Sequence, residues 1–256
     1  MLEQSKEQNM SLRPGLKLCS VCKLTLIIFL LVCLTVLFPG CAPVFSEMQS
    51  AKLIGPGHVE ITSSFSSVSI SSEGESEHIQ NQFGVQAGLG VNRIMDFRLR
   101  YEHISVDMEV LAGGLNSFGL GIPESFGVNI LGFGPKFSLV KDWVAIFVPV
   151  GFAFGEDLEV SDTWQIHPTL LLTLPISKYI EFNSSAKALI PFQSGQETLV
   201  AFNLGIGISP NLEKWVIRTE IGFLYNPGES GHFMHLSVGY TYFTKEYVES
   251  RKIKIP

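Results

Sequence analysis

The sequence alternates between apolar and polar residues with a period of two through most of its length, which limits it to β-structure. Residues 78–91, HIQNQFGVQAGLGV, give the clearest example: every second position from Phe83 to Val91 is apolar, and Gln or Gly lies between. Successive side chains of a strand point to opposite faces, so this strand has one apolar and one polar face. The apolar face contacts either a protein core or membrane lipid.

Composition favours a membrane protein or a heavily buried chain. Charged residues make up 16% of the 256-residue chain, compared with about 25% in a typical soluble domain. Phe occurs 19 times and Gly 24 times. The formal net charge of -6 comes without a basic stripe that could follow a phosphate backbone, so the composition argues against nucleic-acid binding.

The alternation recurs in segments that are mostly about ten to fourteen residues long, whereas a typical soluble strand has roughly five or six. Strands of this length, tilted by about 45°, cross a hydrocarbon layer. Prolines at 135, 149 and 168 each remove a ladder donor, and we expect β-bulges near them. The sequence predicts ten strands: residues 58–70, 78–91, 97–106, 126–139, 144–154, 163–174, 180–190, 198–208, 215–225 and 232–243.

The connections between these strands also alternate. Four are short: residues 92–96, 140–142, 175–179 and 210–214. The other five are mostly longer and acidic, and they contain no Lys or Arg: residues 71–77, 107–125, 155–162, 191–197 and 226–231. In bacterial outer-membrane barrels, short turns face the periplasm and longer loops face the exterior. The pattern therefore predicts an all-β, antiparallel, up-and-down transmembrane β-barrel of about ten strands over residues 57–243, with its apolar face toward lipid.

The chain resembles the small bacterial outer-membrane β-barrel proteins in its ten alternating strands, its short turns opposite longer loops, and its aromatic last strand VGYTYF. The resemblance is architectural and includes no specific family motif. It implies residence in the outer membrane of a Gram-negative bacterium, with outer-membrane lipids and the barrel assembly machinery as partners. Residues 244–256 continue past the final strand as a C-terminal tail.

The N-terminal region predicts export. Residues 24–38 form an apolar run of about 15 residues after basic positions, which fits a signal peptide over residues 1–40, and residues 41–56 form a linker. Gly40 and Cys41 resemble the lipidation box of bacterial lipoproteins, which predicts an acylated Cys41; cleavage after Ser46 is the alternative. With the linker in the periplasm, Cys41 is expected beside the inner leaflet of the outer membrane.

Strand parity directs a set of charged side chains into the barrel. Charges inside a narrow barrel must pair or be hydrated, because an isolated one costs several kcal/mol. The set is expected either to form a balanced network that fills the barrel or to line a charged constriction. Its members are Arg98, Arg100, Glu102, Glu181, Lys187, Arg218 and Glu220.

These observations predict a structural barrel protein or a small-solute pore, with small solutes as candidate cargo. Two alternatives stay open: a surface-binding protein acting through the acidic loop 107–125, and a barrel protease or lipid-modifying enzyme. His78 and His232 could approach each other at the outer rim, but we expect solvated rim histidines and no enzyme. No catalytic, cofactor-binding or metal-binding residues are assigned, and no cofactor is expected.

Overall fold

A computed structural model describes residues 44, 46–72, 75–107, 125–155, 158, 160–227 and 232–244. The regular secondary structure of these residues is β-strand, apart from a short 3-10 turn at Val160–Asp162. Among them, no helix is both long and apolar enough to span a membrane.

The strands are connected up and down in sequence order. β5 and β6 are two parts of one strand, interrupted at Val148 and Pro149, and β7 and β8 are two parts of another, interrupted at His167 and Pro168. The segments are β1 (Val59–Ser72), β2 (Glu75–Gly90), β3 (Met95–Asp107), β4 (Ser125–Val140), β5 (Val144–Phe147), β6 (Val150–Phe154), β7 (Gln165–Ile166), β8 (Thr169–Pro175), β9 (Ile180–Pro191), β10 (Leu199–Ile208), β11 (Trp215–Tyr225) and β12 (His232–Phe243).

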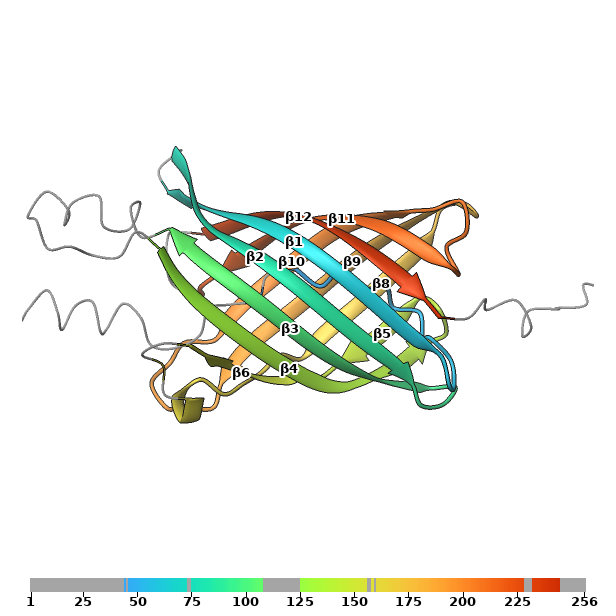
Figure 1. Ribbon diagram of the computed structural model, residues 1–256, viewed down its shortest axis with the longest axis horizontal. Coiled ribbons are helices and arrows are strands. Elements are labelled where there is room, and N and C mark those ends of the chain that lie inside the picture. The colour runs from blue at the N-terminus through green and yellow to red at the C-terminus, as the bar shows by residue number, and fades with distance from the viewer. Residues whose placement is uncertain are drawn as a thin grey trace, which may run out of the picture. The chain divides into compact units, whose positions relative to one another are not determined.

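The sheet closes on itself because β1 pairs antiparallel with both β2 and β12. The closing ladder runs from Glu60 opposite Phe243 to Ser71 opposite His232. Figure 1 shows these strands crossing the barrel obliquely, with β12 and β1 side by side. The predicted ten-stranded antiparallel barrel is confirmed.

The expected bulges at the prolines are wrong. The β3–β4 ladder keeps one register from Met95 opposite Phe137 to Asp107 opposite Ser125, straight past Pro135. At Pro149 and Pro168 the ladder is interrupted, but the register on either side is unchanged. The structure accommodates these prolines by omitting bridges, so no residue is inserted. Register shifts lie elsewhere, between Val68 and Ser69 and between Ser138 and Val140.

The two faces of the barrel wall differ in polarity. Leu204 and Phe202 point outward with 51% and 55% of their surface exposed, whereas the inward Asn203 between them is 1% exposed. Ile79 departs from the outward parity of Phe83, because the register shift at Val68 turns it into the lumen. The apolar face of residues 83–91 is therefore the outer face.

The N-terminal segment lies inside the barrel. Residues 46–51 are all buried, and Ile54 is 5% exposed. We expected residues 41–56 to be a linker outside the barrel, but the described part of that range fills the lumen. The physical reason is complementary charge: Glu47 and Lys52 meet inward side chains of opposite sign.

Candidate functional site

The structure brings the seven inward charges named above together in the lumen. Six of them are at most 8% exposed, and the Arg100 side chain is 11% exposed. They form three groups in the lumen, each of which contains at least one charge that the sequence did not assign to the interior.

The first group surrounds Arg98 on β3. Its guanidinium makes a two-pronged contact with Glu60 of β1, at 2.9 Å from Nη1 to Oε1 and 3.0 Å from Nη2 to Oε2. Asp96 Oδ2 lies 3.7 Å from both Arg98 Nη2 and Lys136 Nζ. Two cations and two carboxylates are thus enclosed together, and this paired geometry offsets the cost of removing them from water.

The second group surrounds Glu47 of the N-terminal segment. Its Oε1 lies 2.7 Å from Lys187 Nζ on β9 and 3.8 Å from Arg100 Nη1 on β3. Arg100 also donates from Nε to Glu102 Oε1 at 2.8 Å. Glu220 of β11 accepts the backbone N–H of Glu47 at 2.8 Å. One residue of the segment therefore contacts three strands that are well separated in the sequence.

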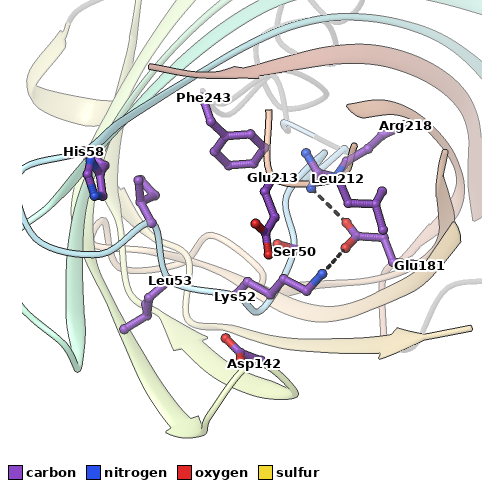
Figure 2. Close-up of a pocket in the computed structure, with 11 residues that line it drawn as sticks. Ser50, Lys52, Leu53, His58, Asp142, Glu181, Leu212, Glu213, Arg218 and Phe243 are labelled. Carbon is purple, nitrogen blue, oxygen red and sulfur yellow. Dashed lines mark hydrogen bonds and ion pairs between the residues drawn. The ribbon is translucent and has the colours of Figure 1, made fainter. Parts of the chain in front are cut away.

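The third group surrounds Glu181 on β9, near the short-turn end. Figure 2 shows Lys52 and Arg218 both directed at this carboxylate, with Lys52 Nζ at 2.7 Å from Oε2 and Arg218 Nη2 at 2.9 Å from Oε1. The group borders a pocket with an empty volume of about 560 Å³, which Leu212 and Phe243 also line. The pocket opens at the short-turn end of the barrel, beside the turns that carry Asp142 and Glu213.

Interior side chains also hold the backbone of the N-terminal segment. Carbonyl oxygens accept from Lys187 (Val44, 2.7 Å), Arg100 (Ser46, 2.5 Å), Gln86 (Glu47, 3.0 Å) and Lys136 (Ser50, 3.2 Å; Lys52, 2.8 Å). Backbone N–H groups donate to Glu220 (Glu47 and Met48), Thr173 (Ala51) and Asp96 (Ile54). The lumen is thereby matched to an irregular polypeptide segment, whose buried backbone groups need such partners.

Apolar clusters pack beside the charges and toward the long-loop end of the lumen. At the long-loop end, Val68, Ile79, Leu189, Ala201 and Leu224 form one buried cluster. A second cluster at that end encloses Val44, and a third, around Phe147, encloses Ala51. Charge and apolar packing together occupy the described lumen from the long-loop end down to the pocket beside Glu181.

The interior charges balance. Six basic residues, Lys52, Arg98, Arg100, Lys136, Lys187 and Arg218, face six acidic ones, Glu47, Glu60, Asp96, Glu102, Glu181 and Glu220. The sequence reading missed five of the twelve. Glu60 shares the inward parity of Thr62 and could have been found. Asp96 was assigned to a turn. Glu47 and Lys52 lie in a segment without the period-two alternation from which an inward direction could be predicted.

The other sites considered from the sequence are the two rim histidines, Cys41 and the acidic loop. His78 Nδ1 lies 3.1 Å from Ser67 Oγ, and the His232 ring lies 6.2 Å from that of Phe223, so the two histidines have different neighbours. Within the described ranges, no group of three or more His, Cys, Asp and Glu side chains could hold a metal ion. Cys41 and residues 108–124 of the acidic loop lie outside the described residues.

Comparison with known proteins finds similar solved structures but no match in sequence. No protein family model matches the chain, and no curated protein matches it in sequence. Ail, the attachment invasion locus protein of Yersinia pestis, is 12% identical over 73% of this chain and 99% of its own, with a TM-score of 0.34. The KdgM porin, solved with disordered oligogalacturonate, is 8% identical over 72% of this chain and 98% of its own, with a TM-score of 0.37.

Neisserial surface protein A is 11% identical over 73% of this chain and 98% of its own, with a TM-score of 0.31. All three neighbours are outer-membrane β-barrels. Similarity at this level concerns the fold alone, and what each neighbour binds is a property of that protein. The class that the structure itself defines is a closed ten-stranded antiparallel β-barrel with an apolar outer face.

Proposed function

We propose that the protein is a structural barrel of the bacterial outer membrane that closes its own lumen with residues 44–54. Outer-membrane lipids contact its apolar wall, and the barrel assembly machinery inserts it. In this state it conducts no small solutes. The interior charges, which could have lined a constriction, hold the chain's own segment instead.

The position of Glu47 is the observation that carries this proposal. Its side chain is buried between Lys187 and Arg100, and its backbone is bonded to Glu220 and Gln86. Removing the segment would leave these charges without their partner in the lumen. Breaking a buried pair typically costs about 3–5 kcal/mol, so the filled lumen is the favoured state unless water enters to hydrate the charges.

Planar-bilayer recording tests the proposal. The full-length barrel is expected to give no steady conductance, whereas Glu47→Ala combined with Lys52→Ala is expected to give openings, because both side-chain anchors of the segment are lost. Lys178→Gln is a matched control, since Lys178 is exposed in a short turn and its loss leaves the lumen unchanged. A steady, ion-selective conductance of the unmodified barrel would instead support the small-solute pore.

A further inference from the structure

The N-terminal segment passes through the barrel in a definite direction. Its C-terminal part lies at the short-turn end: the Ile54 N–H donates to Asp96 at the start of β3, at 3.0 Å. The Gly57 N–H donates to the carbonyl of Gly90 at the end of β2, at 2.9 Å. From there the chain enters β1 at Val59. The segment therefore meets the barrel wall beside the short turns.

The N-terminal part lies toward the opposite end. Val44 packs with Ile104, Val128 and Ala153. Ile104 lies near the end of β3, Val128 near the start of β4 and Ala153 near the end of β6, which are the strand ends that lead into or out of the long loops. Glu47 lies between these positions and the short turns, at the level of Arg100. The chain thus runs from the long-loop half at Val44 to the short-turn end at Ile54.

The described lumen on the short-turn side of Val44 is occupied by the chain itself. Residues 46–54, the interior charges and the apolar clusters already fill the described interior. Val44 therefore lies on the long-loop side of an occupied stretch of the lumen.

From this direction we infer that the protein threads its N-terminal segment through its own barrel and presents the residues before Val44 at the cell surface. The inference rests on the outer-membrane location proposed above and on external long loops. It does not rest on the conductance of the barrel. Cys41 is three residues from Val44, a reach of at most about 11 Å. Any acyl chains on Cys41 would enter the outer leaflet, opposite to the expectation from the sequence.

Antibody access to an epitope tag tests this inference. The tag is inserted between Ala42 and Pro43 of the full-length chain, which leaves Cys41 in place. Two control variants carry the same tag beside Ser161, in a long loop, and between Ser177 and Lys178, in a short turn. We expect antibody on intact cells to bind the first tag and the Ser161 tag, and to bind the Ser177 tag only after permeabilisation.

Two results would overturn the inference. One is an N-terminal tag that antibody reaches only after permeabilisation. The other is a mature protein that begins at Glu47 by mass, since the residues before it would then be absent. If the tag impairs folding, protease treatment of intact cells carrying the untagged protein gives an independent readout. Trimming of the chain before Val44 is expected, and full protection of that region would contradict the threading.

Discussion

The outer wall and the lumen of this barrel reverse the usual arrangement of a soluble protein. Outward residues such as Leu204 and Leu236 are 51% and 65% exposed and apolar, whereas Arg98, Glu102 and Lys136 point inward and are at most 2% exposed. In the proposed membrane location, the outer wall needs only to be apolar, since lipid tails adapt to its shape. The lumen needs specific partners, because each buried charge must find an opposite charge at contact distance. The stability cost of a substitution in the lumen should therefore depend on which partner is lost. The cost of a substitution on the outer wall should depend on its depth in the membrane.

The largest effect is expected from Arg98→Met. The substitution leaves Glu60 and Asp96 enclosed without the guanidinium that contacts both. Loss of one partner of a buried pair typically costs about 3–5 kcal/mol. The free energy of unfolding, measured by urea titration in detergent micelles, is expected to fall by about this amount.

The double variant Arg98→Met with Glu60→Gln separates charge from packing. It removes one charge of each sign, so its stability is expected to recover a substantial part of the loss. If the double variant lost more free energy of unfolding than the two single variants together, the pair would not govern the stability of this group.

A smaller effect is expected when charge is placed on the outer wall. Leu204 lies in the middle of β10, opposite Ile221 of β11, and Leu204→Arg should cost about 2–4 kcal/mol near the bilayer midplane. Leu89 pairs with Phe97 at the short-turn end, so Leu89→Arg should cost only about 0–1 kcal/mol. Unfolding titrations in lipid vesicles measure both variants. Equal losses would contradict the assigned depths.

The period-two alternation was sufficient to predict the fold. Side chains alternate between the two faces of a strand whatever the surroundings, so ten segments, their order and their inward parity could be read locally. The prolines were misjudged because a strand can also omit a bridge and keep its register, as β5 and β6 do around Pro149. Nothing in the local sequence distinguishes these two solutions.

The content of the lumen could be predicted only in part. Parity indicated that Arg98 and Glu181 face inward, but residues 46–54 have no period and so looked like a linker. Their burial depends on partners contributed by many strands, such as Lys187 and Thr173. These contacts arise only after the barrel closes, so a strand-by-strand reading does not reveal them. The complementary charges of Glu47 and Lys52 were the available signal.

After the loss expected for Leu204→Arg, the next largest loss of stability is expected where the N-terminal segment fits against the barrel wall. A Cβ atom at Gly90 would collide with the backbone carbonyl of Gly55, so Gly90→Ala must displace the segment where it meets the wall. Such overpacking typically costs about 1–3 kcal/mol. At Gly132, on β4, the nearest atom to an added Cβ is the Val150 carbonyl oxygen at 3.8 Å, an ordinary contact. Gly132→Ala is therefore the matched control, and thermal unfolding of the two variants should separate them. Equal midpoints would contradict the position of the segment.

The smallest effect is expected at a polar site on the outer wall. Asn129 Oδ1 accepts from Tyr101 Oη at 2.8 Å and lies 3.0 Å from His103 Nδ1. Tyr101 is in the middle of β3, and His103 pairs with Asn129 in the long-loop half of β3 and β4. Polar side chains together on the outer face indicate that the apolar band ends below this level. Water can then replace the lost acceptor, so Asn129→Ala should lower the free energy of unfolding by less than about 1 kcal/mol. A loss near 3 kcal/mol in lipid vesicles would mean that Tyr101 and His103 are left unpaired in hydrocarbon, and that the lipid-facing wall extends farther toward the long loops.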